Sequence, residues 1–560
     1  MISVSFKKWE ECYFEKRKVE KYVQDFSINE TLAKLFIKNN FDKDEIYSVN
    51  EKINFSNIFS NNDDFKLASK IIINSIQNND KILIIGDYDV DGSTATSLLI
   101  KFFKSIKHPH IYYIPDRTID GYGVSKKLFQ KLILKNIKLV VMVDCGSTSY
   151  EAIDYLNQKS IKSIIVDHHE IQKPFPKSNC IINPKKDNGY IKFNYFCATT
   201  LVFFLIFIIS KKIKSNFSLK DNLVYVLLAT VCDVMPIRKI NRFIALKVLN
   251  DFDVKNDIFF SFLFKKLDVK SKLKIDDFAY LIGPILNSGG RLNRSELAVQ
   301  LLSSNVLNDI KKLTNELVLL NEKRKILESI ALKSINYEFL EKMNNDIIIH
   351  YDKEIPEGLI GIISARITEN LNKPSIVITE SQNILKGSAR SIFNFDIGRI
   401  IQTAKNKNIL ITGGGHLMAA GFTLKKNKIN SFIEFLNTKK INYKKKFFYI
   451  SKISSLNLKK NFIDNINKIA PFGNGNEMPI FLLENVIVKK PRILKKKHIL
   501  CLIKTNNDKF YESIAFNAST NNIGRHLLYY KKKINMLCQL KLSDYKNQNK
   551  IQIIIKDLII

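Results

Sequence analysis

The chain has 560 residues, of which 45% are hydrophobic and 25% charged, a composition that excludes a disordered or fibrous protein. Its length exceeds one ordinary core, so we expect several domains. Its 88 Lys and Arg residues against 54 Asp and Glu residues give a net charge of +34, which suits a polyanion such as nucleic acid. Lysine accumulation from AT-rich coding is the alternative explanation, and we assign it roughly half of the excess.

Residues 1–45 are predicted to form a small helical lead-in. Leu32, Leu35 and Phe36 fall at helical spacing within it. The first residues, 1–8, lack the apolar run of a signal peptide. The seven cysteines of the chain are scattered, without a Cys-x-x-Cys pair, which favours a reducing cytoplasm over a zinc ribbon or a disulfide framework.

Residues 46–300 alternate Ile- and Val-rich runs with amphipathic segments, which is typical of an α/β domain with a mostly parallel sheet. The runs 81–86, 139–143 and 163–166 have the composition of buried strands. The very apolar stretch Leu201–Ile209 is shorter than the about 18–20 residues that a membrane span requires. We therefore expect a buried helix there and no membrane association.

A long polar segment, 301–342, predicts a connecting helix. Its expected apolar stripe, which Arg324 interrupts, consists of Leu313, Leu317, Leu320, Leu327 and Ile330. Residues 343–436 predict a second α/β domain with strands at 346–349 and 375–378. The Lys-rich stretch 437–450 is predicted to be a linker.

The pattern changes over residues 451–560. Strand-like runs at 480–483, 499–503 and 551–555 are separated by basic residues. We expect an OB-like β-barrel, a fold that commonly binds single strands of nucleic acid. A β-sandwich is the alternative that periodicity leaves open.

Acidic and imidazole side chains follow each buried strand of the first α/β domain. Asp87, Asp89 and Asp91 follow the first strand, Asp144 the second, and Asp167-His168-His169 the third. Open α/β sheets bind ligands at the carboxyl ends of their strands, so we expect these side chains to meet. Asp233, a polar residue in the apolar stretch 229–236, is a further candidate.

A mixed set of carboxylates and an imidazole suits manganese or magnesium. We predict as metal ligands Asp87, Asp89, Asp91, Asp144, His168 and Asp233. Two ions about 3.5–4 Å apart, bridged by Asp144, can activate a water and stabilise the leaving oxygen of a phosphoester. Each element also has a structural explanation: helix caps for the aspartates, a satisfied pair for the histidines and a turn cap for Asp233.

The motifs Asp87–Gly92, Val143–Ser147, Asp167–His169 and Asp233 resemble, in order and spacing, the four motifs of the DHH phosphoesterase superfamily. Further segments resemble its RecJ branch of single-stranded-DNA exonucleases; they are 114–117, 121–123, 283–292, 358–366, 387–391, 413–416 with 419–421, and 471–476. The resemblance identifies a DHH catalytic domain at 46–300, a DHHA1 domain at 343–436 and an OB domain at 451–560.

The resemblance also implies roles for single residues. His169 is expected beside the scissile phosphate as a substrate contact or proton donor, and Asp144 is expected to take part in catalysis. The expected substrate-binding residues are Arg117, Asn287, Arg291, Gly415 and His416. Guanidinium groups bind phosphate oxygens in pairs. For Gly415 and His416, we expect a glycine run before a helix, whose amides would bind an anion.

The implied function is a metal-dependent exonuclease that degrades single-stranded DNA from 5′ to 3′ into nucleoside 5′-monophosphates in DNA repair and recombination, with Mn²⁺ or Mg²⁺ as cofactor. A helicase and a single-strand-binding protein are the further partners that the resemblance suggests. One alternative is a short-oligonucleotide or cyclic-dinucleotide phosphodiesterase of the same superfamily. Another is a degraded, non-catalytic protein that binds single-stranded nucleic acid.

The sequence departs from the family's pattern at three places. Ile285 stands where an Arg is usual, and Pro356 stands where a His is usual. Leu500 and Cys501 occupy positions after His498 where the family usually has a basic residue. These departures concern the binding of the strand more than the binding of metal.

Overall fold

The computed structural model describes residues 1–47, 58–59, 61–116, 120, 124–133, 136–186, 192–270, 272–342, 345–381, 383–440, 446–543 and 550–560. These form two compact units. The central unit contains Phe55–Met235 and Lys247–Tyr443. The terminal unit contains Met1–Asn54, Pro236–Leu246 and Lys444–Ile560.

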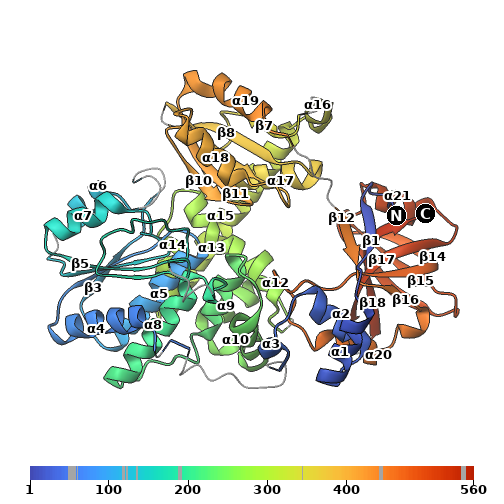
Figure 1. Ribbon diagram of the computed structural model, residues 1–560, viewed down its shortest axis with the longest axis horizontal. Coiled ribbons are helices and arrows are strands. Elements are labelled where there is room, and N and C mark those ends of the chain that lie inside the picture. The colour runs from blue at the N-terminus through green and yellow to red at the C-terminus, as the bar shows by residue number, and fades with distance from the viewer. Residues whose placement is uncertain are drawn as a thin grey trace. The chain divides into compact units, whose positions relative to one another are not determined.

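A parallel five-stranded sheet organises the first half of the central unit (Figure 1). Its order is β3-β2-β4-β5-β6, with bounds β2 Ile82–Ile85, β3 His110–Tyr113, β4 Leu139–Val143, β5 Lys162–Val166 and β6 Cys180–Ile182. The strands at 81–86, 139–143 and 163–166 and the α/β class are confirmed. Nearly every strand residue of β2, β4 and β5 is buried, as expected for strands covered on both faces.

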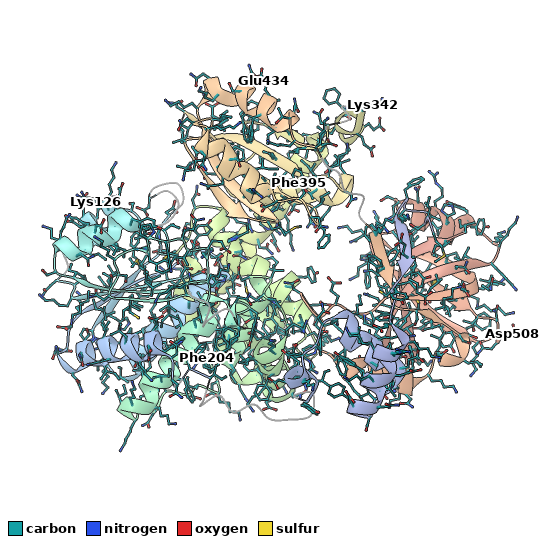
Figure 2. All side chains as sticks on the ribbon, in the orientation of Figure 1. Lys126, Phe204, Lys342, Phe395, Glu434 and Asp508 are labelled. Carbon is teal, nitrogen blue, oxygen red and sulfur yellow. The ribbon has the colours of Figure 1, made fainter. Side chains whose placement is uncertain are left out.

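Helices cover both faces of this sheet (Figure 1). One face carries α4 Asp63–Gln77, α5 Val90–Ser105 and α8 Ala198–Ile213, and the other carries α6 Lys126–Leu132 and α7 Tyr150–Gln158. The apolar stretch 201–209 lies within α8, where Phe204 is 1% exposed (Figure 2). None of the helices among the described residues is long and apolar enough to cross a membrane.

The strand order fixes where a ligand can bind. The chain runs from β2 to β3 on one side and then to β4 on the other side of β2. The connections that follow β2 and β4 therefore run in opposite directions, which leaves a crevice at the carboxyl ends of these two strands. Asp87 follows β2 and Asp144 follows β4, so the topology places the expected ligands at this crevice.

Further helices complete this half: α9 Leu223–Cys232, α11 Ile258–Lys266, α12 Ile275–Asp277, α13 Gly283–Arg291 and α14 Leu297–Ser303. Most of α10 Lys239–Asp251 belongs to the terminal unit, which includes residues up to Leu246. Residues 283–292, which resemble a loop of the family, are therefore mostly helical. Pro284 in the first turn of α13 lacks the amide hydrogen that a first turn leaves unused.

The connecting helix is shorter than expected, and its buried face overlaps the expected apolar stripe only in part, with Leu317 fully buried. α15 spans Leu307–Ser334, and a separate short helix, α16, spans Tyr337–Lys342. Ile330, expected in the apolar stripe, is 60% exposed, whereas Arg324 is buried. Arg324 can be buried because its guanidinium contacts Glu328 Oε2 at 2.7 Å and Asn321 Oδ1 at 3.0 Å.

The second half of the central unit contains a mixed sheet of order β10-β11-β9-β8-β7. Its strands are β7 Ile348–Tyr351, β8 Ser375–Ser381, β9 Ile384–Arg390, β10 Thr412–His416 and β11 Ala419–Leu424. Its helices are α17 Ile360–Leu371, α18 Ile397–Asn406 and α19 Ile429–Asn437. The expected strands at 346–349 and 375–378 overlap β7 and β8.

The glycine run is not followed by a helix, and that expectation is wrong. Residues 412–416 form the edge strand β10, which turns directly into β11. A Cβ on Gly415 would overlap the carbonyl oxygen of Ala419 across this hairpin. Glycine is therefore required for the close approach of two strands rather than for a helix terminus.

The terminal unit contains a closed barrel. Its strands are β14 Phe481–Leu494, β15 His498–Lys504, β16 Phe510–Ala515, β17 Ile534–Ser543 and β18 Lys550–Ile559. They follow the order β14-β15-β16-β18-β17, and β17 pairs back to β14, while α21 Asn522–Tyr529 lies between β16 and β17 in sequence. This closed ring confirms the OB-like barrel and excludes the sandwich.

The lead-in belongs to the same unit and is not helical throughout. Its helices are α1 Lys16–Phe26, α2 Glu30–Lys38 and α3 Lys43–Tyr47. The strand β1 Lys8–Glu11 precedes them and pairs in parallel with β12 Lys446–Tyr449. Asp557 of β18, fully buried, accepts hydrogen bonds from Ser3 Oγ at 2.8 Å, from Trp9 Nε1 at 3.0 Å and from Ser5. These contacts tie the first residues of the chain to the last strand.

Candidate metal centre

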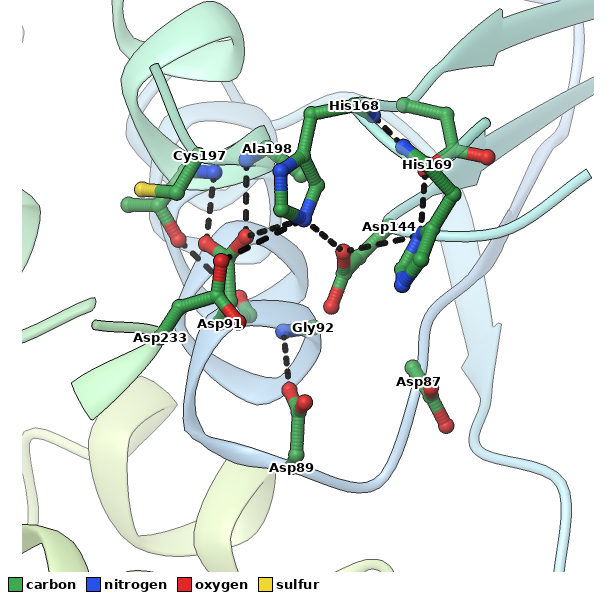
Figure 3. Close-up of polar contacts among 12 residues, drawn as sticks. Asp87, Asp89, Asp91, Gly92, Asp144, His168, His169, Cys197, Ala198 and Asp233 are labelled. Carbon is green, nitrogen blue, oxygen red and sulfur yellow. Dashed lines mark hydrogen bonds and ion pairs between the residues drawn. The ribbon is translucent and has the colours of Figure 1, made fainter. Parts of the chain in front are cut away.

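The loop after β2 is held by its own aspartates (Figure 3). Asp89 caps α5 by accepting the amide hydrogen of Gly92 at 3.0 Å. Asp91, 1% exposed, accepts from the amides of Ala198 at 2.7 Å and Thr199 at 2.8 Å, at the first turn of α8. The cap explanation is therefore correct for both residues, but it does not exclude metal binding, because each carboxylate can accept more bonds.

Asp144 projects from the end of β4 in a left-handed conformation. Its φ is +59°, which a non-glycine residue rarely adopts. Its amide donates to the carbonyl of Val166 at 3.0 Å, so the conformation is fixed by the neighbouring strand β5. Backbone strain of this kind concentrates at functional sites, and here it directs a buried carboxylate toward the histidines (Figure 3).

His168 lies at the meeting point of three elements (Figure 3). Its Nε2 atom is 3.3 Å from Asp144 Oδ1, 3.4 Å from Asp233 Oδ2 and 3.7 Å from Asp91 Oδ2. Asp87, Asp89 and Asp144 form a second group whose oxygens lie within 4.8 Å of one another. The structure thus brings all six predicted ligands into two adjoining groups of three, Asp91/His168/Asp233 and Asp87/Asp89/Asp144.

The donor set fits a divalent cation. Both carboxylate oxygens of Asp144 and Oδ2 of Asp233 are buried and receive no hydrogen bond from the described residues. Buried carboxylates without donors are costly unless a cation compensates them. Carboxylate oxygens with one imidazole are the ligands that manganese and magnesium accept, so the residues fit the expected cofactor.

The electrostatics agree with that fit. Burial and the charges of neighbouring aspartates raise the pKa of Asp144 well above its usual range and that of Asp233 to about 9. Burial lowers the pKa of His168 to about 4, so its imidazole is neutral at pH 7. A neutral imidazole is the form that binds a metal ion.

His169 has the opposite protonation behaviour. Burial opposes its charge, but the hydrogen bond to Asp167 and the charges of Asp167, Asp87 and Asp89 outweigh burial and raise its pKa to about 9. Asp167 Oδ1 contacts His169 Nδ1 at 2.8 Å and also accepts the amides of His168 and His169 at 2.8 and 3.1 Å. Asp167 therefore orients the histidine pair, and Nε2 of His169 remains for a substrate.

Two positioning residues were missed by the sequence analysis. Asn183, fully buried after β6, donates from Nδ2 to the carbonyl of His169 and to Ser147 Oγ, both at 2.9 Å. The amide of Ser147 in turn donates to Asp167 Oδ2 at 3.2 Å. β6 has only three residues. Asn183 nevertheless follows it directly, and polar residues directly after a parallel strand are expected at the ligand-binding edge, as for Asp167.

The predicted substrate residues Asn287 and Arg291 lie four positions apart on α13, and therefore on one face. A Cβ on Gly290 would come within 2.7 Å of the Tyr88 ring, so α13 packs against the loop that carries Asp87 and Asp89. Arg291 Nη1 donates to the carbonyl of Gly358 at 3.3 Å and lines a pocket of about 450 Å³.

His416 is brought to the centre, although it lies in another sheet. Its ring is 6.1 Å from that of His169, with nearly parallel planes at 25°. Gly415 precedes it on β10, and both are exposed. Arg117 lies outside the described residues, as do residues 121–123.

Two of the three departures from the family pattern, Ile285 and Pro356, have different surroundings. Ile285 is 2% exposed within α13, so its side chain contributes to packing. Pro356 lines the pocket of Arg291, together with Lys323 and Lys353. The replacement at 356 therefore changes a surface that a substrate can reach.

Comparison with known proteins agrees with this architecture. Family models match residues 81–230 (DHH family, N-terminal domain), 344–440 (DHHA1 domain) and 451–557 (RecJ OB domain). The single-stranded-DNA-specific exonuclease RecJ of Haemophilus influenzae is 26% identical over 502 residues, covering 84% of this chain and 87% of that protein. RecJ of Bacillus subtilis is 25% identical, covering 98% of this chain and 70% of that protein.

A solved structure shares the whole fold. The crystal structure of Thermus thermophilus RecJ in complex with Mn²⁺ has a TM-score of 0.81 and 19% identity, covering 99% of this chain and 79% of that one. The three family models, the relatives that match over most of this chain and the shared fold agree with one another. The chain belongs to the DHH phosphoesterase family and has the domain set of its RecJ branch.

Proposed function

We propose that the chain is a metal-dependent exonuclease that degrades single-stranded DNA from 5′ to 3′ and releases nucleoside 5′-monophosphates. The observation that carries the proposal is the pair of adjoining ligand groups with buried carboxylate oxygens that no described donor satisfies. A protein that only binds nucleic acid has no need of such a costly arrangement. Relatives that match over 84% and 98% of this chain are named as exonucleases specific for single-stranded DNA.

The chain's own residues would hold two Mn²⁺ or Mg²⁺ ions. Asp91, His168 and Asp233 form one ligand group, and Asp87, Asp89 and Asp144 form the other. Asp144 Oδ1 lies 3.3 Å from His168 Nε2, so Asp144 can serve both groups as a bridge. When bound, such ions supply Lewis-acid stabilisation of the phosphoester and make a water more acidic.

His169 would act on the scissile phosphodiester. Asp167 Oδ1 contacts Nδ1 of the His169 imidazole at 2.8 Å, so Nε2–H is left to donate to a phosphate oxygen or to the leaving oxygen. Asn183 and Ser147 hold this pair in place. Asn287, Arg291, Gly415 and His416, with Arg117, would contact the strand.

The proposal includes the biological setting. The barrel of the terminal unit has the topology of domains that bind single strands, and Phe510 and Phe516 expose 55% and 51% of their surface there. Repair and recombination, a cytoplasmic location, and a helicase and a single-strand-binding protein as partners are parts of the same proposal. Domain limits at 45, 300, 342, 436 and 450 are proposed as well.

The short-oligonucleotide phosphodiesterase is the second candidate within the superfamily. The closed C-terminal barrel favours the exonuclease, because a short oligonucleotide does not need a second binding domain. The non-catalytic alternative is disfavoured because all six ligand residues converge.

The deciding experiment compares 5′-labelled single-stranded DNA, duplex DNA, RNA and a dinucleotide, each incubated with the full chain and Mn²⁺ or Mg²⁺. We expect mononucleotides released from the 5′ end of single-stranded DNA and almost none with Asp144→Ala. Equal release by the variant, or hydrolysis of the dinucleotide alone, contradicts the proposal.

A further inference from the structure

Lys185, Glu170 and the imidazole of His416 form a trio that belongs to neither ligand group and lies beside His169. Lys185 Nζ is 2.9 Å from Glu170 Oε1, and His416 Nδ1 is 3.9 Å from the same oxygen. The side chains of Lys185, Glu170 and His416 are 28%, 60% and 49% exposed, so all three are accessible from solvent. Because the ring of His416 also lies 6.1 Å from that of His169, the trio borders the place where the scissile phosphate would bind.

The backbones of Lys185 and His169 are held by the same side chain, that of Asn183. Lys185 follows β6, the neighbour of β5, and therefore lies at the same edge of the sheet as the histidines. The amide of Lys185 donates to Asn183 Oδ1 at 2.8 Å, while Asn183 Nδ2 donates to the carbonyl of His169 at 2.9 Å. One buried amide side chain thus fixes the backbone of both residues. The Lys185 charge favours the deprotonated forms of His168, Asp233 and His416.

Lys186, the next residue along the chain, makes the contacts expected of a lysine with a structural role. Lys186 Nζ contacts both oxygens of Asp64 at 2.9 and 3.1 Å, and both side chains are mostly buried. Lys185, in contrast, contacts one oxygen of a carboxylate that is largely in solvent. Exposed ion pairs contribute little to stability, so the Glu170 carboxylate is easily exchanged for a stronger anion beside Lys185.

We propose that Lys185 and His416 bind a phosphate of the DNA strand that neighbours the scissile one, and that the Glu170 carboxylate takes this place until a strand arrives. The inference rests on the proposed action on single-stranded DNA. A carboxylate and a phosphodiester both present anionic oxygens, so one can replace the other between an ammonium and an imidazole. The Glu170 carboxylate then repels the strand as long as it remains between Lys185 and His416.

The proposal predicts that removing Lys185 and removing Glu170 change the dissociation constant for the strand in opposite directions. Loss of the cation in Lys185→Ala should raise the dissociation constant for the strand about 5- to 10-fold, because a charge-assisted contact is lost. Loss of the anion in Glu170→Gln should lower it about 2- to 5-fold. Lys185→Arg should restore binding, because a guanidinium contacts phosphate at least as well.

The test measures fluorescence anisotropy of a 3′-fluorescein-labelled oligothymidylate with the full chain in EDTA, where no hydrolysis occurs, across a series of salt concentrations. Lys185→Ala should reduce the slope of log K against log salt by about 0.7. Lys186→Ala removes the same charge from the neighbouring position and should change the dissociation constant less than 2-fold. In Mn²⁺, Lys185→Ala should raise KM with kcat nearly unchanged.

A double-mutant cycle separates a shared phosphate site from two independent charges. The gain from Glu170→Gln should disappear in the Lys185→Ala background, because Glu170 then has no phosphate site to block. Equal effects of Lys185→Ala and Lys186→Ala, or weaker binding by Glu170→Gln, overturn the inference while wild-type exonuclease activity stands. Absence of mononucleotide release by the wild type would instead overturn the proposed function, and the anisotropy data would still decide the role of Lys185.

Discussion

At the scale of single residues, the electrostatic strain of the candidate centre is concentrated in Asp144. This carboxylate is 1% exposed, has four aspartate charges around it, and receives no hydrogen bond from the described residues. It is also the residue whose backbone adopts a left-handed conformation. Features that destabilise the metal-free protein thus coincide with those that a metal ion would compensate.

We therefore expect Asp144→Asn to abolish hydrolysis and yet stabilise the metal-free protein. The folded protein raises the pKa of Asp144 above the unfolded value of about 3.8, so this group removes stability as the pH rises. In EDTA at pH 8, the variant should melt about 2–5 °C above the wild type, and the difference should vanish near pH 4. Calorimetry would detect this.

Added Mn²⁺ provides the control for that result, since it should raise the melting temperature of the wild type and have a much smaller effect on Asp144→Asn. A variant that melts below the wild type in EDTA at pH 8 would contradict the electrostatic account of Asp144.

Asp167 is expected to control the protonation of His169. In the metal-free protein, His169 should titrate near pH 9, because Asp167 bonds its Nδ1. Asp167→Asn removes the charge, so the pKa of His169 should fall toward the usual value of about 6.5. NMR titration of the imidazole would measure both values. The titration of His350, whose pKa depends on burial and on Asp352, serves as internal reference. An unchanged His169 would assign its raised pKa to other aspartates.

At the scale of elements, the central unit depends on a close approach of α13 to the loop after β2. Gly290 makes this approach possible, because any Cβ there would meet the ring and the carbonyl oxygen of Tyr88 at 2.7 and 3.0 Å. Asp87 and Asp89 flank Tyr88, so helix packing and ligand geometry are connected at one glycine.

Gly290→Ala should therefore lower kcat about 10-fold or more by displacing the ligand loop. Gly421→Ala on β11 is the matched control, because its Cβ would have no atom nearer than 4.0 Å. Steady-state kinetics with single-stranded DNA would show whether only the first variant is impaired. Similar kcat values for both variants would mean that the loop adjusts without loss.

At the scale of the whole molecule, the terminal unit is assembled from distant parts of the sequence. Residues 1–54, 236–246 and 444–560 share one set of contacts. Arg242, 5% exposed, donates to the carbonyls of Lys468, Ile469 and Ala470, and Arg238 contacts both oxygens of Glu45. The C-terminal barrel is therefore not expected to fold from residues 444–560 alone.

Deletion of residues 1–11 should destabilise this unit strongly. It removes β1 and leaves Asp557 buried without Ser3, Ser5 and Trp9, which costs about 3 kcal/mol or more for an uncompensated buried charge. Thermal unfolding should show a lower transition, and Asp557→Ala should partly restore it in the deleted chain. A deleted chain that melts like the full one would show that the N-terminal segment is dispensable.

The amino-acid sequence by itself determined the elements with strong local patterns. The buried strands at 81–86, 139–143 and 163–166 are continuous Ile/Val runs, and the acids that follow them could be assigned because strand ends of a parallel sheet share one edge. The OB-like barrel was readable from recurring short strands. Each of these inferences uses residues close together in the chain.

Only the tertiary structure decided the rest, because it depends on contacts between distant segments. The burial of Arg324 depends on Glu328 and Asn321, the edge strand of His416 on its pairing with β11, and the place of β1 on β12. Asn183 and Lys185 follow a strand of three residues, too short to stand out as a pattern. Their importance became visible only when β6 was found beside β5, which brings them to His169.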